Sequence, residues 1–154
     1  MLSRKVERSL PYSAEQMFDL AADVERYPEF LQWWITARIQ QRRGEIFYTN
    51  QVLGLGPIRV SFNSKTVLHR PRRIDVTSDE PPFRQFKLSW TFEPRPGAGC
   101  RVGLVAEIEF ESGLLQRIAN RVLSGAIADI IAAFEARAHL LYPHAERSKN
   151  APMS

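Results

Sequence analysis

The stretch GLLQRIANRVLSGAIADIIAAFEARAHLLY, residues 113–142, decides the fold of this chain. It contains no proline and is rich in Ala, Leu and Ile. Ser112 offers an N-cap before it, and Pro143 ends it. The sequence therefore predicts one long helix from Gly113 to Tyr142.

The predicted helix has an apolar arc that covers more than half of its surface, at about 100° per residue. An arc this wide indicates a helix that is gripped from more than one direction, and its small residues allow close packing or leave room for a ligand. The polar side holds Arg117, Asn120, Arg121, Ser124, Glu135 and His139, and the apolar arc holds Leu115, Ile118, Val122, Leu123, Ala126, Ile130, Ala133, Phe134, Leu140 and Leu141.

Two charged residues, Asp129 and Arg137, fall inside this apolar arc. One interpretation is that Asp129 pairs with a neighbour or reaches the rim of the packed region. The other is that Asp129 is a polar anchor inside a cavity, because an unpaired buried charge is costly without a function.

Upstream of the helix, apolar and polar residues alternate in short segments. Ser13 and Gln16 form a capping-box pattern that opens a short helix, and Asp23 can cap a second short turn that Pro28 limits. Alternating segments in hairpin succession predict an antiparallel sheet with one apolar and one solvated face. The predicted strands are residues 2–9, 35–41, 45–53, 58–68, 74–78, 84–93 and 100–111.

These elements predict an α+β domain in which a curved antiparallel sheet of about seven strands wraps around the long C-terminal helix, with two short helices after the first strand. Such an arrangement often leaves a cavity between sheet and helix. We expect a single domain over residues 1–143 and a disordered polar tail over residues 144–154.

Composition narrows the class of protein. The net charge of +4 over 154 residues favours anionic partners such as lipid head groups or nucleic acid. The single Cys100 excludes an internal disulfide and is typical of a reducing compartment. No uninterrupted apolar stretch suggests a signal peptide or a membrane span.

Groups able to carry chemistry are few. The histidines at 69, 139 and 144 lack the spacing of a metal site, and Cys100 at a strand start is interpreted as structural. Glu107, Glu109 and Glu111 alternate on the solvated face of a strand, where neighbouring cations can balance them. We therefore expect no enzymatic activity, no cofactor and no metal.

The remaining feature is apolar and aromatic, at loops and element ends. These residues either plug the open end of the sheet or form a portal that touches a membrane or admits an apolar ligand. The basic turns at residues 42–43 and 70–73 either meet anionic head groups or are ordinary solvated turns. The predicted portal residues are Phe30, Leu31, Trp33, Trp34, Leu55 and Phe83.

Five motifs occur in an order known from one family. They are DVERYPEFL at 23–31 followed by WW at 33–34, PF at 82–83, WTFEP at 90–94, IEFES at 108–112 and AFEARA at 133–138. Over about residues 1–142 the chain resembles the coenzyme Q-binding protein family of the START-like (polyketide cyclase/dehydrase) superfamily. Bacterial relatives of that family are also named ribosome-association toxins.

The resemblance implies a helix-grip fold that binds ubiquinone or a similar isoprenoid lipid, as a carrier or chaperone supporting respiratory electron transport. It also implies, through the toxin-named relatives, contact with the large ribosomal subunit. Because the chain lacks the N-terminal extension of mitochondrial members, it looks like a bacterial, cytoplasmic version, with peripheral contact on the inner face of the membrane. DNA is not an expected partner.

Strand parity and the helix wheel give the predicted ligand cavity. Its apolar walls would favour a quinone tail at about 25 cal/mol per Å² buried. The head group would meet Asp129 through water or a proton, or a polar group near Trp33 and Arg84. A register error of one residue would invert the contribution of a strand. The predicted cavity residues are Phe62, Leu88, Trp90, Val102, Leu104, Val122, Ala126, Asp129 and Ile130.

Three functions therefore compete. The first is the quinone carrier, and the second is a protein that binds the large ribosomal subunit and affects subunit association. The third is a polyketide cyclase-like enzyme, which needs a polar pair inside the cavity, where Asp129 is the one obvious member.

Overall fold

The computed structural model describes residues 1–143, and the tail predicted for residues 144–154 lies outside the described part. The described elements follow the predicted order, with strand ends that differ by at most two residues. They are β1 (Leu2–Leu10), α1 (Ala14–Ala22), the 3-10 helix η1 (Val24–Glu29), β2 (Trp34–Arg43), β3 (Ile46–Leu55), β4 (Ile58–His69), β5 (Arg73–Ser78), β6 (Phe83–Pro94), β7 (Cys100–Phe110) and α2 (Gly113–Leu141).

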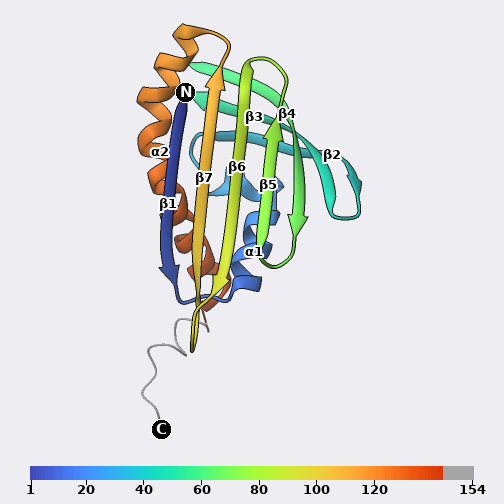
Figure 1. The fold of residues 1–154 in the computed structure, drawn as a ribbon, viewed down its shortest axis with the longest axis vertical. Coiled ribbons are helices and arrows are strands. Elements are labelled where there is room, and N and C mark those ends of the chain that lie inside the picture. Colours follow the sequence, from blue (N-terminus) through green and yellow to red (C-terminus); the bar gives the residue numbers. More distant parts are fainter. Residues whose placement is uncertain (144–154) are drawn as a thin grey trace.

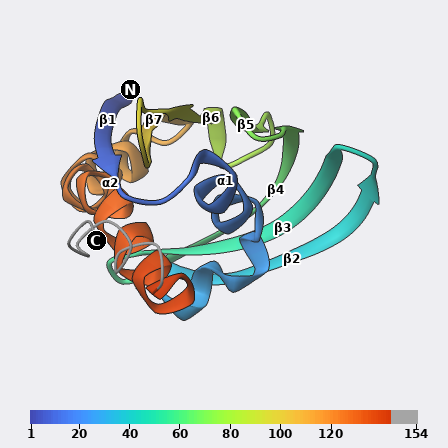
Figure 2. The same cartoon turned by 90° about the horizontal axis from the view of Figure 1, so that it is seen from below.

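The strands form one seven-stranded antiparallel sheet in the order β1-β7-β6-β5-β4-β3-β2. β1 and β2 are therefore its two edges, although they follow each other closely in the chain. Figure 2 shows the sheet curling around α1, with α2 lying at the open side beside β1. This arrangement confirms the predicted α+β helix-grip fold (Figure 1).

The concave face of the sheet forms the core because alternate residues of each central strand point into it. Both helices contribute aromatic rings to this core. The Phe18 ring of α1 lies 5.7 Å from Phe92, and the Phe134 ring of α2 lies 4.8 Å from Trp90. The predicted strand parity is confirmed, since Phe62, Leu88, Trp90, Val102 and Leu104 are all buried.

Local signals explain the short elements. The capping box at Ser13 is confirmed: its hydroxyl accepts from the backbone N–H of Gln16, whose side chain accepts from the Ser13 N–H. The expected cap at Asp23 is wrong, because its side chain makes no capping hydrogen bond. Glu25 of η1 instead accepts from the Ile39 N–H at 3.1 Å and so occupies a donor on the exposed edge strand β2.

Two predictions about exposed or packed leucines are wrong. Leu55 was predicted to be a portal residue outside the strand at 45–53, but β3 extends to this residue, which pairs with Ile58 and is completely buried. The turn is therefore reduced to Gly56 and Pro57. Leu140 and Leu141 were assigned to the apolar arc, yet they are 74% and 50% exposed because they lie beyond Ala138, the last buried residue of α2.

One flank of α2 is fastened to the sheet edge by polar contacts. The guanidinium of Arg4 on β1 donates to the Ser124 hydroxyl at 3.1 Å, and Arg8 pairs with Glu135 at 2.9 Å. Near the start of α2, the side chain of Gln116 accepts a hydrogen bond from the backbone N–H of Phe110 on β7 at 2.7 Å. Ser124 and Glu135, which belong to the predicted polar side of the helix, therefore face β1.

None of the helices within residues 1–143 combines the length and the apolar character needed to cross a membrane.

Two glycines in the β6–β7 turn should differ in how much an added side chain lowers the stability of the protein. Gly97 and Gly99 both have positive φ, but a Cβ on Gly97 meets open space, whereas one on Gly99 would lie 2.2 Å from the Leu10 carbonyl oxygen. We expect Gly97→Ala to lower the free energy of unfolding by about 1–2 kcal/mol. Gly99→Ala should lower it clearly further, because backbone must also move; urea denaturation measures both. Equal losses would contradict this packing of the turn against β1.

Candidate functional site

An apolar groove of about 420 Å³ opens between α2 and the segment that joins η1 to β2. It lies on the flank of α2 away from the polar contacts to β1. Six of its eight lining residues are apolar, so the groove suits a hydrocarbon surface better than a polar metabolite. We call it the helix groove; its lining residues are Phe30, Leu31, Gln32, Trp33, Ala126, Asp129, Ile130 and Ala133.

Hydrogen bonds hold the sheet side of the helix groove in place. The Leu31 N–H donates to the Tyr27 carbonyl at 2.9 Å, and the Trp34 N–H donates to the Leu31 carbonyl at 3.1 Å. The buried Tyr27 hydroxyl donates to the Ala21 carbonyl, and burial raises the pKa of this phenol far above its usual range. Trp34 anchors the end of the segment through its indole N–H, which donates to Gln51 Oε1 at 2.8 Å.

An aromatic cluster adjoins the helix groove. The Phe134 ring of α2 lies edge-on to Phe30 at 5.0 Å and to Tyr27 at 5.4 Å, while Trp33 lies 4.9 Å from Trp34. Edge-to-face pairs of this kind add stabilisation beyond the area they bury. Tyr27, Trp34 and Phe134 belong to the core, whereas Phe30 and Trp33, which line the groove, remain partly exposed.

A salt bridge fastens α2 to η1 beside the groove. Arg137 Nη2 lies 2.6 Å from Glu29 Oε1, and the guanidinium lies 5.2 Å from the centre of the Phe30 ring. Hydrogen bonding from Arg137 lowers the pKa of Glu29 below its ordinary range. The charge that the helix wheel placed in the apolar arc is therefore explained by a partner and a cation–π contact.

Asp129 is exposed at the rim of the helix groove. This agrees with the interpretation that it reaches the rim and disagrees with a polar anchor buried in a cavity. On the opposite side of the opening, Gln32 is the other polar residue of the lining. The groove therefore offers one carboxylate and one amide at its mouth.

The structure brings six predicted site residues together, three from each predicted group. Phe30, Leu31 and Trp33 of the predicted portal meet three residues of the predicted cavity, Ala126, Asp129 and Ile130. The predicted cavity residues of the sheet are buried in the core. They line neither the helix groove nor the second groove on α2, which is described below. These residues are Phe62, Leu88, Trp90, Val102 and Leu104.

Four portal predictions are corrected by burial. Leu55, Trp34 and Phe83 are buried because each lies at a strand end whose side chain points into the concave face, and Leu31 is also buried although it lines the helix groove. These four side chains cannot touch a membrane in this conformation. The expected polar group near Trp33 and Arg84 is also not formed, since these residues line different openings.

A second groove, which sequence reasoning missed, lies along the first half of α2. It has a volume of about 450 Å³ and includes the predicted cavity residue Val122. The only signal for it was Leu114, an apolar residue at the start of the helix on the outer side. We call it the turn groove; its lining residues are Pro57, Leu114, Arg117, Ile118, Arg121 and Val122.

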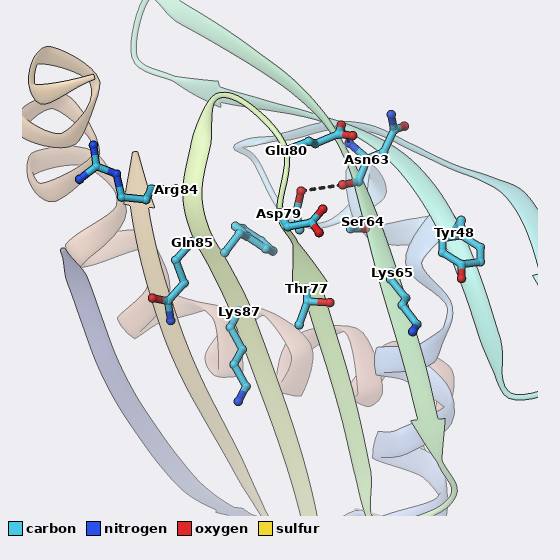
Figure 3. A pocket seen from close by; sticks show the side chains of 12 residues that line it. Tyr48, Asn63, Ser64, Lys65, Thr77, Asp79, Glu80, Arg84, Gln85 and Lys87 are labelled. Atoms are coloured by element: carbon cyan, nitrogen blue, oxygen red, sulfur yellow. Dashed lines mark hydrogen bonds between the residues drawn. The ribbon is translucent and has the colours of Figure 1, made fainter. Parts of the chain in front are cut away.

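Figure 3 shows a different opening, a hollow of about 500 Å³ on the convex face of the sheet. Its lining mixes charges of both signs with hydroxyls and amides, including Lys65, Lys87, Asp79 and Glu80. The Glu80 carboxylate already accepts from the Asn63 N–H at 2.7 Å. This polar hollow suits an apolar lipid less well than the helix groove.

The core behind Trp34 contains buried polar groups. Gln51 Nε2 donates to the Ser64 hydroxyl at 2.6 Å, which extends the hydrogen bond from Trp34 into the concave face. Within residues 1–143, the buried Thr49 hydroxyl has no partner. An unpaired buried hydroxyl costs about 1–3 kcal/mol, so the interior is not wholly apolar.

Cys100 does not behave as a nucleophile in this structure. It is completely buried, and burial raises the pKa of its thiol to about 11. The thiol is therefore protonated at neutral pH, and the thiolate is the reactive form of cysteine.

Comparison with known families gives a match over most of the chain. The family described as polyketide cyclase/dehydrase and lipid transport matches residues 10–135.

Curated relatives carry two kinds of name. "Ribosome association toxin RatA" is 31% identical in Escherichia coli K12, over 86% of this chain and 84% of the relative, and 27% identical in Pseudomonas aeruginosa, over 92% and 99%. "Coenzyme Q-binding protein COQ10 homolog B, mitochondrial" of Xenopus laevis is 28% identical over 94% of this chain and 62% of its own length.

Solved structures share the fold. The 18 kDa protein CC1736 of Caulobacter crescentus has a TM-score of 0.75 at 30% identity, covering 93% of this chain and 99% of that protein. The Zhui aromatase/cyclase of a Streptomyces species has a TM-score of 0.74 at 15% identity, covering 97% and 98%. At that identity the second likeness concerns the fold alone.

The salt bridge beside the helix groove predicts a pH-dependent stability. Because the folded protein lowers the pKa of Glu29, this residue adds stability above its unfolded pKa, and that stability is lost as the pH falls through the lowered value. We expect Glu29→Gln to have a lower melting temperature than the parent at neutral pH. The two melting curves should converge in acid. A difference that persists unchanged in acid would contradict this origin.

Proposed function

Because the chain belongs to the polyketide cyclase/dehydrase and lipid transport family, we propose that it is a binding protein for an apolar ligand, most specifically ubiquinone or a related isoprenoid quinone. In this proposal it carries the quinone in support of respiratory electron transport and does not transform it. The observation that carries the proposal is the helix groove, in which apolar residues of α2 face the aromatic segment before β2.

The physical chemistry of the helix groove supports an isoprenoid tail. Burial of a tail against Phe30, Trp33 and Ile130 is favourable by about 25 cal/mol per Å² of apolar surface and needs no covalent bond. The small Ala126 and Ala133 leave the space on the helix side. Since the groove is open to solvent, a tail longer than the groove can extend beyond it.

The head group would lie at the mouth of the groove. Quinone carbonyl oxygens are acceptors, and the Gln32 side-chain amide can donate to one of them. The exposed Asp129 carboxylate is itself an acceptor, so it can approach the head group only through water or a proton. We therefore assign the direct polar contact to Gln32.

The groove holds too few groups to support a cyclase-like reaction. Asp129 is its one ionisable lining residue, and acid–base catalysis of a cyclisation usually needs a placed partner. The buried Cys100 thiol is protonated and lies outside the groove. We accordingly propose binding without turnover.

Filling the helix groove tests the carrier. We expect Ala126→Trp to reduce the ubiquinone that the protein extracts from membranes at least tenfold, because the indole occupies the space of the tail. Ala128→Trp is the matched control, since Ala128 is exposed on the same helix and lines neither groove. The copurifying lipids are measured by mass spectrometry. Equal extraction of ubiquinone by both variants would contradict the proposed binding site.

A second candidate is binding to the large ribosomal subunit. It is favoured by the relatives named "Ribosome association toxin", which this chain matches over 99% and 84% of their length. All three arginines of the predicted basic turn are exposed, but Arg70 pairs with Asp19 and Arg73 with Asp75, whereas no ion pair joins Arg72 to an acidic residue within residues 1–143. This turn is therefore less available to phosphates than the sequence indicated.

Co-sedimentation tests the ribosome candidate. If this function is correct, the protein pellets with large subunits, and the bound fraction falls steeply with salt because phosphate contacts release counterions. Replacing Arg70, Arg72 and Arg73 by Ala should remove binding, whereas Arg101→Ala, an exposed arginine on β7, should not. Absence of salt-sensitive pelleting, with quinone extraction intact, rejects this candidate.

A further inference from the structure

We propose that the turn groove is a docking surface for an anionic lipid bilayer. The inference rests on the proposed carrier function, because it gives the place at which the protein would meet the membrane that supplies its ligand. The surface joins the Gly56–Pro57 turn to the first half of α2 and combines apolar side chains with two arginines.

The apolar part of this surface projects from the molecule. Leu114 is 60% exposed at the first turn of α2, and Pro57 is exposed at the tip of the β3–β4 turn. Between them, Ile118 and Val122 are half-buried and form the base of the groove. A protruding leucine and proline over an apolar base can enter the interfacial region of a bilayer.

The charged part of the surface is uncompensated. Arg117 and Arg121 are exposed one helical turn apart, and no ion pair joins either of them to an acidic residue within residues 1–143. The turn groove has no acidic lining residue. In contrast, two other arginines that form contacts of α2 are each paired with a glutamate: Arg8 of β1 with Glu135, and Arg137 of α2 with Glu29. Two free cations beside apolar residues complement the head groups of anionic lipids.

The docking surface is continuous with the helix groove. Ile118, Val122, Ala126, Ile130 and Ala133 follow at intervals of three or four residues along the same flank of α2, from one groove into the other. A lipid tail that leaves the bilayer at the turn groove would therefore meet apolar side chains along its whole path.

The chemistry favours a bilayer over RNA. RNA phosphates would use Arg117 and Arg121 but gain nothing from an exposed Leu114 and Pro57. A bilayer uses both parts at once: the cations meet the head groups, and the apolar side chains meet the acyl boundary. The role of Leu114 is therefore the discriminating observation.

The test is sedimentation with vesicles of phosphatidylcholine and phosphatidylglycerol. We expect Arg117→Gln/Arg121→Gln to lower the partition coefficient about 25-fold, since each cation near an anionic surface contributes about fivefold. Leu114→Gln should lower it about tenfold, because burial of the leucine is lost. The matched control is Arg38→Gln/Arg101→Gln, which removes two exposed arginines of β2 and β7 and should change partitioning less than twofold.

Three results would overturn the docking surface: equal losses in the control pair, no effect of Leu114→Gln, or vesicle binding intact in the Arg117/Arg121 variant while its binding to large ribosomal subunits is lost. A separate readout isolates the carrier function. Quenching of tryptophan fluorescence by a soluble short-chain ubiquinone analogue should be unchanged in the docking variants. If the parent protein fails to bind the analogue but the substitutions change vesicle partitioning as expected, the carrier proposal is rejected and the docking surface is supported.

Discussion

The structure depends on an asymmetric grip of the sheet on α2. On one flank of the helix, Arg4 of the edge strand β1 donates to Ser124, and Arg8 of the same strand pairs with Glu135. The buried face of the helix packs into the core. On the side of the other sheet edge, α2 meets the segment before β2, the β3–β4 turn and β3. These contacts leave an apolar strip of the helix partly uncovered, and both grooves lie on that strip.

The segment before β2 is fixed at its two ends and less tightly packed between them, where a ligand can bind. The salt bridge between Glu29 and Arg137 and the hydrogen bond between Trp34 and Gln51 fix the two ends of the segment before β2. Between these ends, Phe30 and Trp33 are only partly buried against α2. A ligand can therefore bind between this segment and α2, while the sheet and the polar flank of α2 stay in place.

Much of this fold follows from sequence patterns, and the exceptions have physical causes. Alternation gave the strand faces correctly because one face of each central strand is buried, and the length of residues 113–142 required the covering helix. A helix wheel, however, cannot tell which polar residues face a neighbouring strand, so Ser124 and Glu135 looked solvated. Leu55 and Phe83 looked like loop residues because strand ends are poorly marked, and a shift of one or two residues moves a side chain from the surface to the core. The site is predictable only in part, since it forms where Phe30 and Ala126, distant in sequence, meet across an opening.

The most direct test of the account is an isotope-filtered NOE measurement on the labelled protein with an unlabelled isoprenoid quinone. The account predicts intermolecular NOEs between the methyl groups of the tail and the Ala126 and Ala133 methyls and the Trp33 ring. NOEs to Tyr48 and Lys87 on the convex face, with none along α2, would contradict it.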